Sequence, residues 1–204
     1  MKKLIVLLIV AFTFLKCQTK SEEVSLASKS TDDINKIVEA IIQQDSLDVF
    51  KNRPNPRMFC SELNKITVDI PIKRKDGLLF PPIPGNIYIN NLLNDKVNGE
   101  EFFTSKDSLS ILEQNSNPEK IEIDKEISEK LNSTTFEIEL AKKKNGKKYD
   151  FYNLSIPIFS QDRQKAFVEL EHHCGSLCGS GTGFYLKKVN GKWKVVEKWR
   201  TWIS

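Results

Sequence analysis

The chain has 204 residues, of which 39% are hydrophobic and 28% are charged, a composition that suits one folded domain with a sizeable core. Its formal charge of +4 depends on Lys2, Lys3 and Lys16, because without residues 1–16 there are 28 basic and 27 acidic residues. A near-neutral chain lacks the basic surface that nucleic-acid-binding proteins use, so the composition predicts no nucleic-acid partner.

The first 16 residues have the order of a secretory signal peptide. Lys2 and Lys3 supply a positive start, and the run from Leu4 to Leu15 is apolar except for Thr13. A helix of this length would span only about 18 Å of a hydrocarbon core about 30 Å thick. The segment therefore predicts export rather than a membrane-spanning helix.

The apolar run ends at Phe14-Leu15-Lys16-Cys17 and passes directly into polar residues. This junction resembles the lipobox of Bacteroidota lipoproteins, with Phe14 and Lys16 standing where most lipoboxes carry Leu and a small residue. The resemblance implies a signal peptide over residues 1–16 and acylation of Cys17, for example by palmitate. It also implies a lipid-anchored protein of the bacterial cell envelope, at the outer membrane, whose first partner is the membrane itself. The alternative is an incidental thiol near a conventional cleavage site.

Beyond Cys17 the chain changes character twice. Residues 17–30 are rich in Ser, Lys and Glu without periodicity, which predicts a flexible tether. From Thr31 to about Gln44 the spacing predicts an amphipathic helix whose apolar positions are Ile34, Ile37, Val38, Ile41 and Ile42. No repeat or second change in composition follows, so residues 31–204 are predicted to form a single domain.

The middle of the chain carries weaker signals. The alternation from Ile66 to Ile72 predicts a strand, although Pro71 removes a donor and favours a sheet edge. Prolines and a glycine over residues 81–85 predict a loop. Short strands are expected around residues 87–89 and 121–123, and a short helix from Ser105 to Gln114, capped by Ser105 or Asp107.

The C-terminal third predicts most of the sheet. Expected strands run from Phe136 to Leu140, from Tyr152 to Ile158, from Lys165, from Phe184 to Val189 and from Lys192 to about Ile203; Asn-Gly turns follow the first and fourth, and the glycine-rich segment 175–183 connects the third and fourth. The predicted fold class is α+β: the N-terminal amphipathic helix packs on an antiparallel, curved sheet that ends in a four-stranded C-terminal meander.

Three cysteines remain once Cys17 is acylated. Cys174 and Cys178 are four positions apart in a glycine-rich segment, and an oxidising compartment favours a disulfide between them. Pairing of Cys60 with either of the two is the alternative, because connectivity is not readable from sequence.

The run from Glu169 to Cys174 holds the only concentration of chemically versatile side chains. Strand parity places His172 and Cys174 on an apolar face with Leu170, and places Glu169, Glu171 and His173 on the other face. His172 is interpreted as a core histidine, and the alternative is a general base or metal ligand. His173 is expected to be solvated. The sequence predicts no cofactor and no metal, because CxxxC differs from the usual zinc spacing.

The last fifty residues or so, with Cys-Gly-Ser-Leu-Cys-Gly (174–179) and Asn-Gly-Lys-Trp-Lys (190–194), resemble the C-terminal half of uncharacterised Bacteroidota envelope lipoproteins. The resemblance carries no activity to transfer. We expect a non-catalytic domain that binds a small ligand or another envelope protein. One alternative is an envelope hydrolase using His172 with Cys174 or a carboxylate, and another is an immunity or inhibitor lipoprotein.

Overall fold

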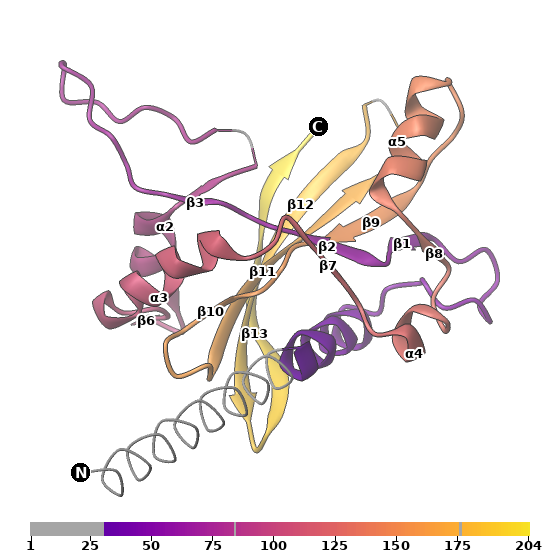
Figure 1. The fold of residues 1–204 in the computed structure, drawn as a ribbon, viewed down its shortest axis with the longest axis horizontal. Helices are drawn as coiled ribbons and strands as arrows, with labels where there is room; N and C mark the ends of the chain where they lie inside the picture. Colours follow the sequence, from indigo (N-terminus) through magenta and orange to yellow (C-terminus); the bar gives the residue numbers. More distant parts are fainter. Residues whose placement is uncertain (1–30, 84, 176) are drawn as a thin grey trace, which may run out of the picture.

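The computed structural model describes residues 31–83, 85–175 and 177–204, which form a mixed fold of helices around one large open sheet (Figure 1). The predicted signal peptide, Cys17 and the tether lie outside the described residues. Within the described part, no helix is long and apolar enough to cross a membrane.

The large sheet has seven strands, with the order β13-β12-β11-β9-β1-β8, and β10 also pairs with β11. Its strands are β1 (Met58–Cys60), β8 (Ser133–Thr134), β9 (Phe151–Leu154), β10 (Ile158–Phe159), β11 (Lys165–His173), β12 (Gly179–Val189) and β13 (Lys192–Ile203). β1 runs parallel to β8 and β9, and every other pairing is antiparallel. The C-terminal antiparallel meander is therefore as predicted.

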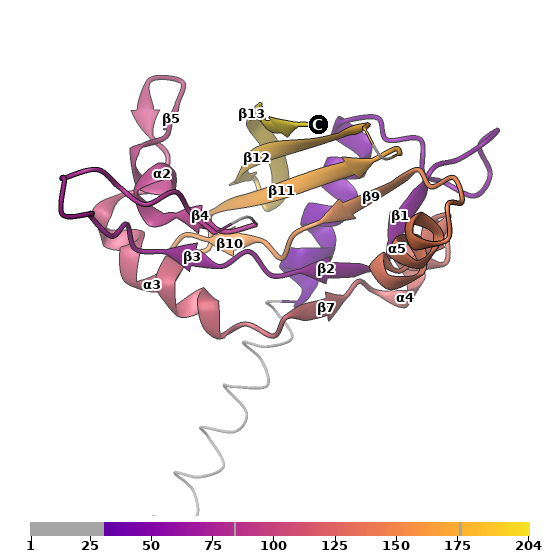
Figure 2. The same cartoon turned by 90° about the horizontal axis from the view of Figure 1, so that it is seen from above.

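A helix over residues 31–44 covers one face of this sheet (Figure 2). The predicted apolar stripe is buried: Ile37, Val38 and Ile41 form one core with Val168 and Leu186. These residues meet because alternate positions of β11 and β12 point to the same face. The expected packing of this helix on the sheet is confirmed for the residues described.

The opposite face of the sheet carries a second core at one end. Phe167 and Tyr185 point there and pack against Leu92, Phe102 and Ile111. The surrounding elements are β3 (Val68–Asp69), β4 (Ile87–Tyr88), α2 (Ile89–Asn94), β5 (Lys96–Val97), β6 (Glu100–Glu101), η1 (Ser105–Asp107), α3 (Ser108–Glu113) and η2 (Gln114–Ser116). The expected helix at 105–114 is present, but its cap is Thr104, whose backbone N–H donates to Asp107. Two further elements, β2 (Glu62–Asn64) and β7 (Lys120–Glu122), pair with each other, and α4 (Lys125–Ser128) follows.

The prediction of a strand from Phe136 to Leu140 is wrong, because these residues begin helix α5 (Phe136–Lys144). The Thr135 side chain accepts a hydrogen bond from the backbone N–H of Ile138 and caps the helix. Acidic residues in its first turn and lysines in its last turn favour the helix dipole. Helical geometry also reverses the expected burial, since Glu139 is buried and Ile138 is exposed.

Three other predictions need correction. The expected strand from Tyr152 to Ile158 is divided into β9, which ends at Leu154, and β10, which begins at Ile158. The expected strand from Ile66 to Ile72 is reduced to β3, after which the chain leaves the body of the protein as an exposed hairpin. The glycine-rich segment was expected to be a connection as far as Gly183, but β12 already begins at Gly179. Aromatic rings lie against these glycines in the extended strand, with Trp202 against Gly181 and Phe167 against Gly183.

Candidate functional site

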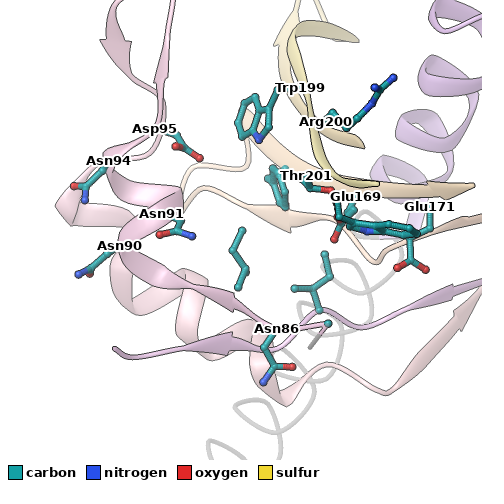
Figure 3. A pocket seen from close by; sticks show the side chains of 15 residues that line it. Asn86, Asn90, Asn91, Asn94, Asp95, Glu169, Glu171, Trp199, Arg200 and Thr201 are labelled. Atoms are coloured by element: carbon teal, nitrogen blue, oxygen red, sulfur yellow. Dashed lines mark hydrogen bonds between the residues drawn. The ribbon is translucent and has the colours of Figure 1, made fainter. Parts of the chain in front are cut away.

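A cleft of about 530 Å³ opens between α2 and the sheet, on the face opposite the N-terminal helix (Figure 3). One wall comes from α2 and the residues just before it, and the other comes from β11 and β13. The cleft is lined by Ile66, Gly85, Asn86, Ile87, Asn90, Asn91, Asn94, Asp95, Phe167, Glu169, Glu171, Trp199, Arg200, Thr201 and Trp202. It therefore combines aromatic rings, carboxamides and carboxylates.

The sheet side of the cleft is aromatic. Trp199 stacks on Tyr185 with ring centroids 4.4 Å apart, and Phe167 lies 5.0 Å from the same tyrosine. Tyr185 is itself fixed by a hydrogen bond of 2.6 Å from its hydroxyl to Asp95. Burial raises the pKa of Tyr185, and the bond to Asp95 adds to this effect. Packing against Phe167 and the hydrogen bond to Asp95 therefore fix the ring of Tyr185, on which Trp199 stacks.

A bulge in β13 brings two tryptophans to the same wall. Trp199 and Trp202 are three positions apart and would face opposite sides of a regular strand. The register with β12 shifts between Gly181 and Thr182, so that Gly181 pairs with Trp202 and Thr182 with Arg200. The extra residue turns both indoles toward the cleft.

Gly181 makes room for this arrangement. A Cβ atom built on Gly181 would lie 2.2 Å from Nε1 of Trp202 and 2.4 Å from the Thr201 hydroxyl. Only a glycine lets that indole and hydroxyl lie across the strand without displacement. The glycines therefore serve the aromatic wall, and the sequence interpretation of a turn missed this.

Glu169 and Glu171 lie on the cleft face of β11, as strand parity predicts. Glu169 accepts a hydrogen bond from the Thr201 hydroxyl, and no Lys or Arg pairs with it among the residues described. Burial raises the pKa of Glu169, and the nearby Glu171 carboxylate raises it further, against the lowering effect of Thr201. Glu169 is thus a partly desolvated carboxylate held without a cation.

The pKa of Glu171 is shifted in the opposite direction, to a lower value than usual. Burial opposes its ionisation, but hydrogen bonds from His173 and Asn153 outweigh burial and lower the pKa. The distances are 3.2 Å to Nε2 of His173 and 3.1 Å to the Asn153 amide. The cleft therefore holds a carboxylate, Glu171, that stays ionised at lower pH than Glu169.

The α2 wall supplies amide groups. Asn91 lies on the side of α2 that borders the cleft, whereas Asn90 and Arg200 point away from its centre (Figure 3). The Asn86 amide donates to Asp69 at 2.9 Å, which fixes the segment before α2. The α2 wall therefore adds amide groups, which can donate or accept hydrogen bonds, and the carboxylate of Asp95, while the two glutamates lie at the other wall.

His172 and Cys174, the candidates from sequence, do not line this cleft. His172 Nε2 lies 2.8 Å from Oδ1 of Asp150, and its ring stacks on Tyr152 at 4.6 Å. Arg57 lies 3.3 Å from Oδ2 of the same Asp150. A carboxylate does accompany His172, which parity along β11 could not reveal because Asp150 precedes β9. These contacts hold the ring near the C-terminal end of β11.

Cys174 and Cys178 have their sulfur atoms at disulfide distance, with Cα atoms 5.0 Å apart. A sulfur held in a disulfide carries no thiolate, so this arrangement offers no Cys174 nucleophile. The alternative pairing of Cys60 is not adopted: Cys60 is a buried free thiol, and burial, with Glu139 adding to it, raises its pKa to about 12.

His173 departs from the expectation of a solvated residue. Its ring stacks on Phe151 at 4.8 Å, and its side chain keeps only 26% of its exposure. The imidazole supports Glu171 from the edge of the cleft rather than facing water freely.

Among the described residues, no group of three His, Cys, Asp or Glu side chains is arranged to hold a metal ion. No protein-family model matches the chain, and neither the curated proteins nor the solved structures contain a significant match to it.

Proposed function

We propose that this chain is a lipid-anchored protein of the bacterial cell envelope whose domain is non-catalytic and binds a small organic cation in the cleft between α2 and β11–β13. The observation that carries the ligand class is the combination of Trp199 on an aromatic wall with Glu169, a carboxylate that has no basic partner among the described residues. Organic ammonium groups bind well where an aromatic face and an anionic group lie close together. The attraction between the cation and the aromatic face alone reaches about 2 kcal/mol at a desolvated site.

The charge balance of the cleft supports this ligand class. Asp95, Glu169 and Glu171 border it, while Arg200 points away from its centre (Figure 3). These carboxylates give the cleft an anionic lining, which suits a ligand that carries a positive group. A pocket of about 530 Å³ is also within the size range of small-molecule sites.

The proposal of a lipid anchor at Cys17 is supported by the sequence alone. The apolar segment, the junction at Cys17 and the likeness of the C-terminal region to Bacteroidota envelope lipoproteins support it together. A tether of 14 residues from Cys17 to Ser30 would hold the domain about 20 Å from the anchor on average.

The anchor predicts a clear effect of Cys17→Ala. We expect loss of fatty-acid labelling and release of the protein from the outer-membrane fraction, because acyl chains at this position supply the stable membrane attachment. Metabolic labelling with an alkyne fatty acid and membrane fractionation measure the two effects. Cys60→Ala is the matched control, and unchanged labelling of Cys17→Ala would contradict the proposal.

The ligand class predicts that choline binds and that 3,3-dimethylbutanol, its neutral isostere, does not. Isothermal titration calorimetry at neutral pH compares the two. Glu169→Gln should weaken choline binding at least tenfold, equal to about 1.4 kcal/mol. Glu197→Gln, which changes an exposed carboxylate on β13 outside the cleft, should leave binding unchanged. Equal binding of the two ligands would contradict a cation site and favour a neutral ligand.

Glu169→Gln should also change the stability of the protein in a way that depends on pH. Because the pKa of Glu169 is raised by folding, its ionisation opposes folding above that pKa, and this cost disappears below the pKa of the unfolded chain. Glu169→Gln should therefore raise the melting temperature at neutral pH, by about 2–4 °C if the gain is about 1 kcal/mol, and have little effect near pH 3.5. The affinity of the natural chain for choline should fall as the pH is lowered through the pKa of Glu169, because the protonated side chain carries no negative charge.

A further inference from the structure

A hairpin over residues 70–83 projects from the body of the protein between β3 and β4 (Figures 1 and 2). All residues from Ile72 to Ile83 are exposed. Backbone bonds close it on itself: Lys73 pairs with Leu79, and Phe80 donates to the Ile72 carbonyl at 3.2 Å. The hairpin is therefore an ordered projection with exposed side chains, and none of its residues from 70 to 83 lines the cleft proposed above.

Its composition is unusual for an exposed segment. Six of the eleven exposed large hydrophobic side chains of the described residues lie in this hairpin: Ile70, Ile72, Leu78, Leu79, Phe80 and Ile83, each between 47% and 67% exposed. Contiguous exposed apolar surface marks a docking site for a membrane or a protein. The apolar surface continues into a groove of about 510 Å³ at the base, lined in part by Tyr88 and Leu112.

The charges at the tip distinguish between those two partners. Lys73, Arg74 and Lys75 are consecutive and exposed, and only Asp76 opposes them. Arg74 lies 3.3 Å from Asp76 and 5.8 Å from the centre of the Phe80 ring, so cationic and apolar groups lie side by side. This is the arrangement of interfacial segments, in which apolar side chains enter the boundary between headgroups and acyl chains while basic groups remain among anionic headgroups.

We propose that the 70–83 hairpin is a membrane-contact element that places Leu78, Leu79 and Phe80 in the surface of an anionic bilayer. The basic tip supplies charge complementarity with the lipid phosphates, because each Lys or Arg near an anionic membrane surface is attracted to it. The hairpin would fix which side of the domain faces the membrane.

The test uses the full-length protein purified from membranes, with a single added cysteine carrying an environment-sensitive nitrobenzoxadiazole dye. Leu79→Cys reports the hairpin, and Ile138→Cys on α5, at the far end of the molecule, is the matched control (Figure 1). The unsubstituted chain carried through the same labelling measures background; Cys60 is buried. The protein is mixed with phosphatidylcholine vesicles with or without phosphatidylglycerol.

We expect a blue shift of the dye at position 79, and quenching by brominated lipid, with phosphatidylglycerol vesicles only. The dye at position 138 should remain in water. Joint reversal of Lys73, Arg74 and Lys75 to Glu should abolish the quenching, whereas reversal of the exposed lysines 143, 144 and 147 should not. A dye at position 79 that stays in water on both vesicles overturns the proposal and favours a protein partner. Equal quenching on both vesicles also overturns it, because the hairpin would then enter a bilayer without any need for anionic lipid.

Discussion

Asp33→Ala should lower the free energy of unfolding by about 3–5 kcal/mol, because it removes one member of a buried ion pair and leaves the other without compensation. Asp33 lies in the N-terminal helix with its side chain only 4% exposed. Its Oδ1 accepts from Nζ of Lys188 at 2.5 Å and from the Trp193 indole at 3.2 Å. These contacts join the helix to β12 and β13.

The neighbouring residue provides a control for this prediction. Asp32 forms an ion pair with Lys36 in the same helix, but both side chains are at least half exposed. Asp32→Ala should therefore cost less than about 1 kcal/mol. Urea denaturation of the two variants measures the difference. Equal losses would show that the Asp33 contacts contribute no more than a surface pair.

Phe167→Ala should also cost about 3–5 kcal/mol, by leaving a cavity at the centre of the second core. The ring is 1% exposed and lies against Tyr185 at 5.0 Å and Trp199 at 6.4 Å. The melting temperature should fall by about 10 °C. Because Phe167 supports the aromatic wall, the emission of Trp199 should also shift in the folded state.

Phe80→Ala is the matched control for this substitution. It removes the same ring from a side chain that is 53% exposed, and should change stability by no more than about 0.5 kcal/mol. Thermal unfolding followed by circular dichroism compares the two variants. A small loss for Phe167→Ala would mean that the rings beneath the cleft repack, and the wall would then not be preorganised.

The elements that sequence could predict have long, one-sided patterns. The apolar stripe from Ile34 to Ile42 predicts the N-terminal helix, and the alternation along Lys165–His173 correctly separates Leu170 from Glu169. In contrast, five alternating residues from Phe136 fit a strand and a helix equally well, and the Thr135 cap decides between them. Short patterns fail because local capping outweighs periodicity.

The cleft lay beyond prediction because its two walls are far apart in sequence. Asn91 and Trp199 meet only through tertiary packing, and the bulge near Thr201 that turns two indoles the same way has no sequence signature. A hint was present in the glycines of β12, since Gly181 opposite Trp202 indicates a ring lying on the strand. Recognising it requires the strand register, which sequence alone does not supply.

The central claim is that an organic cation occupies the cleft, and nuclear magnetic resonance of the tryptophan indole N–H groups tests it most directly. Trp199 and Trp202 line the cleft, whereas Trp193 is buried in the other core. Choline should shift the first two resonances and leave the Trp193 resonance in place, and 3,3-dimethylbutanol should shift none. Unchanged resonances of Trp199 and Trp202 at saturating choline, or equal shifts with the neutral isostere, would contradict the account.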